Sequence, residues 1–246
     1  MAEASFAEVS LGIVCPMANE AATAEAFVDA VLTECRAYGL GDVTLFAVVD
    51  RVSVDDTREL LDALASAEPA LRVVWAPETR GVADAYLRGY REALDAGCDW
   101  ILEIDAGFSH EPAQIGAFLE TMARGYDCVF GSRFRAGGAD HAGTKRQLVS
   151  RGGTVLTNAL LGTRLTDMTS GFELFSRAAL EGALAKGVTS TGPFFQTELK
   201  VHCRNLRVAE VPIRYDTDSE RVGRKAIAES FLTLGSLVRR RLAGSL

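Results

Sequence analysis

The chain of 246 residues lacks a long apolar run, and no stretch approaches the roughly 18 residues that a membrane-spanning helix needs. Its start, residues 1–6, also lacks the basic beginning and apolar core of a secretory signal peptide. We therefore expect a cytoplasmic protein.

Low-complexity tracts, internal repeats and linkers rich in proline, serine and glycine are also missing. The length suits one large α/β domain or two small ones. Because 48% of the residues are hydrophobic, a sizeable core can form. With no linker to divide the chain, we predict a single domain over residues 1–246.

Cysteines are few and scattered: the chain has five, an odd number, and none occurs in a Cys-x-x-Cys pair. This usage excludes a disulfide framework and a cysteine zinc site. We expect most of them to be small core residues, namely Cys15, Cys35, Cys98, Cys128 and Cys203.

Lysine is scarce, and all four lysines fall in the second half of the chain. Residues 1–125 hold 22 acidic and 8 basic side chains, a net charge of −14, whereas residues 126–246 hold 11 acidic and 18 basic, a net of +7. A basic half suits an anionic partner such as a phosphate group or a membrane surface. Scatter over solvated helix faces is the alternative, and charge counts leave both open.

Short apolar runs alternate with helical periodicity from residue 9 to residue 131. Because the strands are apolar throughout, they predict a mostly parallel, Rossmann-like α/β sheet with helices on both faces. Strands are expected at 9–14, 43–49, 71–75, 100–104 and 127–130. A helix that ends at residue 37 follows the first strand, and helices at 57–67, 81–96 and 112–124 follow the next three. Later helices are expected at 145–161, 194–203 and 226–241, with a strand at 206–213.

Two acids mark strand ends, Asp50 in Val-Val-Asp and Asp105 in Glu-Ile-Asp. Ligands of such folds bind at the carboxyl edge of the sheet, so we expect both carboxylates at adjacent strand ends in one cleft. Each alone is equally well explained as a helix cap. Glu103 precedes Asp105 by two residues on the same strand face, and we expect it to form a salt bridge with a nearby arginine.

Two further polar residues follow the fifth predicted strand. Arg133, in Gly131-Ser-Arg-Phe134, can grip a phosphate with two hydrogen bonds, although surface arginines are common. Asp167 lies in the polar turn Thr166-Asp-Met-Thr-Ser-Gly-Phe172. It belongs either to an acceptor or phosphate site or to a simple Asx turn.

An ordered set of motifs resembles family 2 glycosyltransferases of the GT-A fold, and within them the polyprenyl (dolichol) phosphate mannose synthases. The resemblance runs from about residue 9 to residue 225. Its motifs are Ile13-Val-Cys-Pro-Met-Ala-Asn-Glu20, Val48-Val-Asp50 with Ser53 and Asp56-Thr57, Arg80-Gly81, Arg88-Gly89, Glu103-Ile-Asp-Ala-Gly-Phe-Ser-His110, Gly131-Ser-Arg-Phe134 with Gly137-Gly138, Arg146 with Ser150 to Gly152, Asp167-Met-Thr-Ser-Gly-Phe172, Phe195-Gln-Thr-Glu198 and Glu210-Val-Pro-Ile213.

This resemblance implies an inverting enzyme that moves a hexose from a nucleotide-diphosphate sugar, GDP-mannose or a UDP-sugar, to a phosphate- or hydroxyl-bearing acceptor such as a polyprenyl phosphate. It implies a nucleotide-binding half over about 9–131 and an acceptor half over about 132–246. A phosphate acceptor is already an anionic nucleophile, so stabilising the departing nucleotide diphosphate is the main task. A divalent cation, Mg²⁺ or Mn²⁺, and arginines do this. We expect no nucleic-acid partner.

The resemblance also implies roles for individual residues. Asp105 would face the metal and the diphosphate, and Asp50 would meet the base or ribose. Catalytic residues would be Asp105, Arg133 and Asp167; donor-binding residues would be Pro16, Asn19, Glu20, Asp50, Gly81, Asp105, Ala106 and Gly107; acceptor- or phosphate-binding residues would be Arg133, Arg146, Ser150, Arg221 and Lys225.

Three positions depart from the family pattern. Gly107 replaces the second of two aspartates, which removes one metal ligand. Arg51 replaces a second acid after Asp50, where it can lie near the phosphates or pair with Asp50 or Glu103. The late Arg-x-Gly-x-Ser-Lys motif becomes Arg221-Val-Gly-Arg-Lys225, one residue shorter.

These departures leave three interpretations open: an enzyme with relaxed metal dependence, an enzyme for an unusual acceptor, and a nucleotide-sugar- or partner-binding protein that has lost catalysis. A nucleotidyltransferase is disfavoured, because Pro16-Met-Ala-Asn19 is not the glycine-rich loop that it requires.

The last predicted helix carries an apolar stripe and ends in Arg239-Arg-Arg241. The stripe suits packing on its own domain or on a second copy in a homodimer. The alternative is peripheral attachment to a membrane that bears a lipid-phosphate acceptor. We predict packing for the stripe residues Ile227, Phe231, Leu234, Val238 and Leu242.

Overall fold

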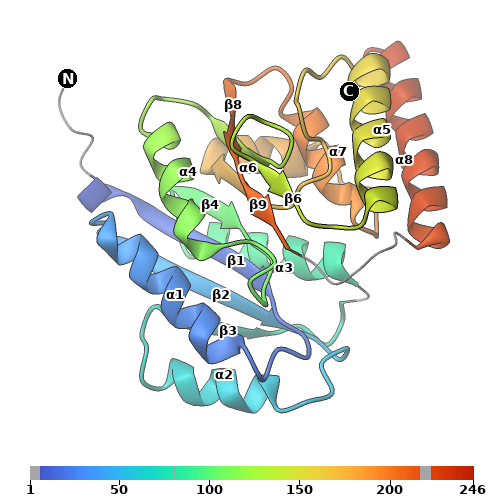
Figure 1. Cartoon of the computed structure of the whole chain (residues 1–246). Coiled ribbons are helices and arrows are strands. Elements are labelled where there is room, and N and C mark those ends of the chain that lie inside the picture. The colour runs from blue at the N-terminus through green and yellow to red at the C-terminus, as the bar shows by residue number, and fades with distance from the viewer. Residues whose placement is uncertain (1–5, 80, 217–222) are drawn as a thin grey trace.

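A seven-stranded sheet crosses the molecule in the order β3-β2-β1-β4-β7-β5-β8 (Figure 1). The computed structural model describes residues 6–79, 81–216 and 223–246. Neighbouring strands are parallel except β7, which is antiparallel to both β4 and β5. The strands are β1 (Ser10–Pro16), β2 (Asp42–Val49), β3 (Leu71–Trp75), β4 (Trp100–Glu103), β5 (Cys128–Ser132), β7 (Glu173–Ser176) and β8 (Val208–Pro212).

Helices cover both faces of this sheet, as the uniformly apolar strands predict. A small parallel pair, β6 (Ala139–Asp140) and β9 (Arg214–Tyr215), lies outside it. The helices are α1 (Ala24–Ala37), α2 (Thr57–Ala65), α3 (Val82–Asp95), α4 (Ile115–Met122), α5 (Thr144–Leu161), α6 (Arg177–Ala185), α7 (Phe194–His202) and α8 (Arg224–Leu242), with single 3₁₀ turns at η1 (Phe6–Glu8) and η2 (Pro112–Gln114).

The core consists of one apolar layer on each face of the sheet. Side chains of α1, α2 and α4 pack on one face, and those of α3, α6 and α7 pack on the other. Each fully buried large apolar side chain stabilises the fold by about 1.5–3 kcal/mol. All five cysteines are buried and unpaired, which confirms their prediction as core residues.

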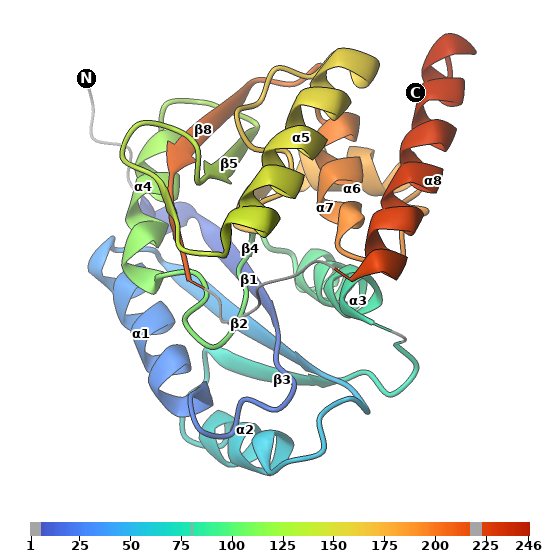
Figure 2. The ribbon, with the colours of Figure 1, turned by 45° about the vertical axis from the view of Figure 1, so that its right-hand side comes forward.

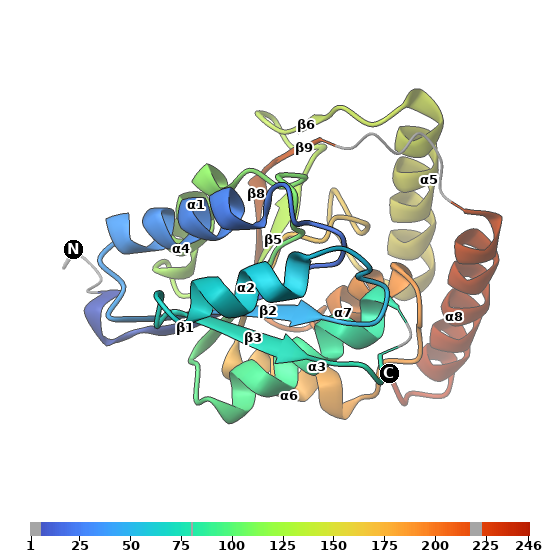
Figure 3. The same cartoon turned by 90° about the horizontal axis from the view of Figure 1, so that it is seen from below.

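A third apolar cluster joins α5, α7 and α8 through Leu161, Val201, Leu234 and Leu237. Figures 2 and 3 show α5 and α8 side by side at one edge of the molecule, away from α1 and α2. Within residues 6–79, 81–216 and 223–246, no helix combines the length and the apolar character needed to cross a membrane.

The predicted packing stripe of α8 is only partly correct. Leu234 and Val238 pack in the third cluster, but Phe231 and Leu242 are exposed. The buried face is centred on Leu234 and Leu237, so Phe231 and Leu242 lie to one side of it.

Candidate active site

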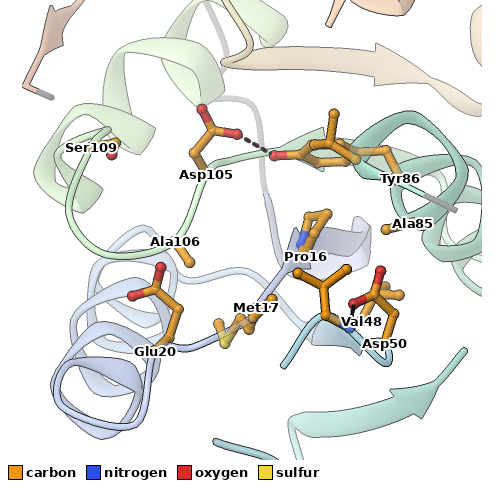
Figure 4. Close-up of a pocket in the computed structure, with 14 residues that line it drawn as sticks. Pro16, Met17, Glu20, Val48, Asp50, Ala85, Tyr86, Asp105, Ala106 and Ser109 are labelled. Carbon is orange, nitrogen blue, oxygen red and sulfur yellow. Dashed lines mark hydrogen bonds between the residues drawn. The ribbon is translucent and has the colours of Figure 1, made fainter. Parts of the chain in front are cut away.

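A pocket of about 380 Å³ opens where β1, β2 and β4 end, at the carboxyl edge of the sheet (Figure 4). This size lies within the usual range of small-molecule sites. Its lining combines the ends of β1 and β2, the loops that follow β1, β2 and β4, and the start of α3: Pro16, Met17, Ala18, Glu20, Val48, Asp50, Val52, Gly81, Val82, Ala85, Tyr86, Asp105, Ala106 and Ser109.

Asp50 follows β2 directly and is almost fully buried. Its Oδ1 accepts a hydrogen bond from the Val52 amide at 2.9 Å, and its Oδ2 accepts one from the Thr79 hydroxyl at 3.0 Å. Neither bond caps a helix. The carboxylate is therefore fixed at the edge of the pocket by its own loop and by the segment after β3.

Asp105 comes two residues after β4, and the pairing of Glu103 with Val14 on β1 places it beside the end of β1. The Tyr86 hydroxyl of α3 donates to its Oδ1 at 2.6 Å (Figure 4). Burial raises the pKa of Tyr86, and the charge of Asp105 raises it further, so the phenol keeps the proton that it donates.

Asp50 and Asp105 line the same pocket, as we predicted. Their strands are not adjacent, however, because β1 lies between β2 and β4. That part of the prediction was wrong, since order along the chain does not give order in the sheet.

Gly107 adopts a left-handed conformation, with φ +66°, on the loop after Asp105. A Cβ atom at this position would lie 2.8 Å from Oε2 of Glu20. The Glu20 carboxylate therefore occupies the space beside the position where the family carries its second aspartate, and the Thr23 hydroxyl donates to it at 2.8 Å.

In the described part of the chain, no three His, Cys, Asp or Glu side chains are grouped closely enough to hold a metal ion by themselves. Asp105 and Glu20 nevertheless both line the pocket. Magnesium typically takes one or two protein carboxylates and completes its shell with water and substrate phosphates. The two carboxylates are oxygen donors of the type that such a cation uses.

Asn19 and Gly107, two of the predicted donor-binding residues, are not among the residues that line the pocket. Asn19 instead joins two loops, because its side chain donates to the Val52 carbonyl and accepts from the Val54 amide. Arg51 is exposed and forms no ion pair with Asp50 or Glu103 in the described structure.

A second pocket, of about 170 Å³, adjoins the first, and Asp105 lines both. Two arginines and several hydroxyl side chains make its wall polar, and the charge of one arginine, Arg133, is balanced by a buried aspartate. Its lining residues are Val82, Asp105, His110, Arg133, Arg146, Thr169, Ser170, Gly171, Pro193, Phe195, Gln196 and Tyr215.

Arg133 and Asp167 form a buried ion pair in the wall of the second pocket. Nε and Nη2 of Arg133 donate to the two oxygens of Asp167 at 2.7 and 2.9 Å, and Nη2 also donates to the Thr169 hydroxyl. Burial would raise the pKa of Asp167, but the hydrogen bonds and charge of Arg133 lower it below its ordinary value. Asp167 also makes the Asx-turn bond with the Thr169 amide. It does not line the pocket and instead holds Arg133 in place.

The other predicted acceptor residues are dispersed. Arg146 lines the second pocket and donates to the Tyr215 hydroxyl. Ser150 is buried on α5 and Lys225 is exposed on α8, and neither lines the pocket. Arg221 lies outside the described residues.

His110 ends one of the family motifs but had no predicted role, and the structure places it fully buried in the second pocket. Burial lowers its pKa to about 4, so the ring is neutral near pH 7. The Asp105 amide donates to Nδ1 at 3.2 Å, which leaves the ring proton on Nε2. No described residue accepts a hydrogen bond from Nε2.

The expected salt bridge between Glu103 and an arginine is absent. Glu103 is fully buried and accepts hydrogen bonds from the Tyr90 hydroxyl and the Gln196 amide. Tyr90 and Tyr86 are spaced four residues apart on one face of α3. This spacing was the available sequence signal, since buried tyrosine hydroxyls need partners.

Comparison with known proteins identifies the family. The model of the family described as "Glycosyl transferase family 2" matches residues 12–183. The chain belongs to glycosyl transferase family 2. Among its curated relatives, undecaprenyl-phosphate mannosyltransferase of Micrococcus luteus is 33% identical over 171 residues, covering 68% of this chain and 70% of the relative. Polyprenol monophosphomannose synthase of Mycolicibacterium smegmatis is 34% identical over 172 residues, covering 68% of this chain but only 65% of the relative.

Solved structures extend the likeness of this family 2 member to nearly its whole length. Glucosyl-3-phosphoglycerate synthase of M. tuberculosis superposes with a TM-score of 0.68 at 20% identity, covering 97% of this chain and 82% of that one. Its complex with Mn²⁺, UDP and glucosyl-3-phosphoglycerate gives a TM-score of 0.65 at 21% identity, covering 98% and 80%. The GT-A fold is thereby confirmed.

Proposed function

We propose that this chain transfers a hexose, with inversion, from a nucleotide-diphosphate sugar to a phosphate-bearing acceptor, with a polyprenyl phosphate as the favoured acceptor class. The observation that carries the proposal is the position of Asp105, which lines both pockets. The larger pocket suits the nucleotide, and the smaller one, lined by Arg133 and Arg146, suits the acceptor phosphate. The names of the two curated relatives support both the lipid phosphate and mannose.

In this arrangement the anomeric carbon lies at the junction between the pockets. An acceptor phosphate oxygen attacks that carbon from the second pocket, and the bond to the donor diphosphate breaks on the opposite face. The bonding electrons leave with the nucleotide diphosphate, and the configuration inverts. Because the acceptor is already an anion, no side chain has to remove a proton. Binding both substrates in line supplies the orientation that the reaction needs.

Cationic and hydrogen-bonding groups of the second pocket hold the acceptor. Arg146 and Arg133 contribute charge, and Nε2–H of His110 contributes a buried donor that lacks a described partner. Charge-assisted bonds to phosphate are about twice as strong as neutral ones. Asp167 acts through Arg133, whose guanidinium it orients.

Asp105 and Glu20 would hold a divalent cation, Mg²⁺ or Mn²⁺, together with the donor diphosphate. When bound, such an ion neutralises charge on the leaving group. Two carboxylates beside a diphosphate would otherwise repel it, which supports a cation at this site.

Donor binding tests the first pocket. Titration calorimetry with GDP-mannose and UDP-sugars, in the presence of Mg²⁺, should identify one donor that binds. Asp50→Asn should weaken that donor roughly tenfold or more, because a bond to a charged group contributes about 1.5–3 kcal/mol. Asp62→Asn, on the exposed face of α2, is the matched control and should bind normally. Absence of binding by every donor contradicts the proposal.

The metal placement has its own test. Gly107→Asp adds a carboxylate beside Asp105 and Glu20. Aspartate tolerates the left-handed backbone, and the end of the Glu20 side chain has to shift to admit the new Cβ atom. We expect Mn²⁺ to bind roughly tenfold more tightly when it is titrated with the nucleoside diphosphate of the donor that calorimetry identifies and followed by electron paramagnetic resonance. Gly39→Asp, at φ +68° in open space, is the control. Equal Mn²⁺ affinity in all three proteins would place the metal elsewhere.

A non-catalytic, nucleotide-sugar-binding protein is the second candidate, and the absence of an acid at position 107 favours it. Product analysis separates the two candidates. Tight donor binding without transfer to a short-chain prenyl phosphate, and without donor hydrolysis, would support this candidate against the enzyme.

A further inference from the structure

Tyr215 lies where the basic and polar groups of the second pocket meet. It belongs to β9, is half-buried and lines that pocket. The guanidinium carbons of Arg133 and Arg146 lie over its ring, 5.5 and 5.4 Å from the centroid, and Arg146 also donates to its hydroxyl at 3.0 Å. A guanidinium within about 6 Å of an aromatic ring is attracted by the negative face of that ring. One aromatic side chain therefore contacts both of the arginines that line the pocket in the described structure.

The ring of Tyr215 also contacts His110, the buried donor of the same pocket. The centroid of the His110 ring lies 5.2 Å from that of Tyr215 and 5.0 Å from that of Phe172. Its Nδ1 accepts a hydrogen bond from the Asp105 amide at 3.2 Å. These three contacts hold the imidazole, and Nε2, which has no partner among the described residues, is the atom left to donate to a ligand.

Backbone hydrogen bonds fix the position of Tyr215 between two segments. On one side β9 pairs with β6, where Asp140 is the partner of Tyr215. On the other side an isolated bridge joins Tyr215 to His110, and the Asp216 amide donates to the Ser109 carbonyl at 3.0 Å. Because these bonds do not involve the tyrosine side chain, a substitution at this position should change the ring and leave the strand in place.

We propose that Tyr215 is a positioning residue for the acceptor phosphate, and that its ring holds Arg146 and His110 in the orientation in which both reach one phosphate group. Groups that are ordered before binding lose less conformational freedom when the ligand arrives. Arg133 is already oriented by Asp167, so the ring acts mainly through the other two groups. The identity of the acceptor rests on the proposed function, whereas the effect of the ring on phosphate binding can be measured without turnover.

Titration calorimetry of the full chain with a short-chain prenyl phosphate tests this role. Tyr215→Leu removes the ring and the hydroxyl, and its dissociation constant for the prenyl phosphate should rise roughly tenfold or more. Tyr215→Phe keeps the ring and loses only the hydroxyl, which water can replace as the acceptor for Arg146 at this half-buried position. The dissociation constant of this conservative variant should therefore rise only about threefold.

Tyr126→Leu is the matched control. Tyr126 is also half-buried and has a guanidinium over its ring, that of Arg207 at 5.7 Å, but it lines neither pocket. This variant loses the same kind of pair and should bind the prenyl phosphate normally. All three variants should keep the native donor affinity, which reports that the first pocket is intact. If Tyr215→Leu also loses donor binding, Tyr215→Phe decides, and an unchanged affinity for the prenyl phosphate there overturns the proposal.

Steady-state kinetics with the same acceptor separate this role from the proposed function. Because the ring acts on acceptor binding, Tyr215→Leu should raise KM for the prenyl phosphate and change kcat little. Transfer by Tyr215→Leu with a native KM overturns the positioning role and leaves the proposed function standing. Weakened prenyl phosphate binding in Tyr215→Leu, in a chain that transfers no sugar, supports the positioning role and contradicts the proposed function. An equal loss of binding in Tyr126→Leu overturns the positioning role, and a native chain that binds no prenyl phosphate overturns both it and the acceptor class.

Discussion

The hydroxyl of Tyr86 fixes the carboxylate that lies between the two pockets. It donates to Oδ1 of Asp105 at 2.6 Å, while Oδ2 lies 3.8 Å from Nδ1 of His110. Asp50 is held in a similar way by Val52 and Thr79. Both acids are therefore oriented before any ligand binds, which lowers the entropy cost of forming the reactive complex.

Replacing Tyr86 with phenylalanine should slow transfer. The variant loses a bond to a charged group, so we expect kcat to fall roughly 10- to 100-fold. The donor dissociation constant should rise less than kcat falls, because Asp50 and its loop are untouched although Tyr86 and Asp105 both line the donor pocket. Steady-state kinetics and calorimetry measure the two quantities.

Tyr90→Phe is the matched control, one turn further along α3. It removes the bond to Glu103, which lines neither pocket. The free energy of unfolding of this variant should therefore fall, while its kcat should stay close to the native value. Equal kcat values for native protein and Tyr86→Phe would show that this hydroxyl does not position Asp105.

Strand β7 brings two buried acids together below the site. It inserts antiparallel between β4 and β5, and its Glu173 pairs with Glu103 in the register. Lys200 of α7 forms an ion pair with Glu173 at 3.0 Å. Burial raises the pKa of Glu173 to about 7, although Lys200 lowers it. The pKa of Glu103 is also raised, first by burial and then by the charge of Glu173.

This raised pKa predicts a pH dependence of stability. The contribution of Glu173 is fully present below its unfolded pKa of 4.5 and is lost as the pH rises through about 7. Glu173→Gln cannot titrate, so its free energy of unfolding relative to the native protein should rise between pH 4.5 and 7.

Denaturant unfolding across this pH range measures that difference. Glu25→Gln, on the exposed surface of α1, should follow the native curve. Parallel curves for the native protein and Glu173→Gln would mean that Glu173 ionises normally in the folded chain.

The whole molecule is built around a single sheet to which both halves of the chain contribute. β7, from the second half, lies between β4 and β5 of the first, so the predicted nucleotide and acceptor halves interlock. Asp105 lines both pockets and so marks the place where they meet. A ligand in either pocket therefore contacts the common core of the fold.

Donor binding should accordingly stabilise the entire chain. At a donor concentration one hundred times its dissociation constant, the free energy of unfolding should rise by about 2.7 kcal/mol. For a chain of this length, that corresponds to a rise of roughly 5–10 °C in Tm. Differential scanning fluorimetry measures the shift, and Asp50→Asn should reduce it at the same donor concentration. A donor that binds by calorimetry without raising Tm would indicate that it also binds the unfolded chain.

The sequence pattern by itself determined those elements whose structure depends mainly on residues close together in the chain. The strands β1 to β5 and the helices between them were predicted because apolar runs and 3.6-residue periodicity are local signals. The motifs around Asp50 and Asp105 likewise led to the family and to a cleft at the carboxyl edge. By contrast, β7 and α6 were missed, as were the two-residue strands β6 and β9. The three strands carry too few residues to show a period, whereas α6 has nine residues, as many as the predicted α2, and its buried face is formed mainly by small alanines.

Tertiary structure alone decided which distant groups meet. Tyr86 meets Asp105, Glu173 meets Glu103, and the Glu20 carboxylate lies beside Gly107, although none of these pairs is close enough in sequence to share one pattern. The exposure of apolar side chains on α5 could not be predicted either, since the sequence of an apolar helix face does not show whether another element covers it. Burial and partner choice depend on sheet order and helix packing, which are set by the free energy of the whole chain rather than by any segment of it.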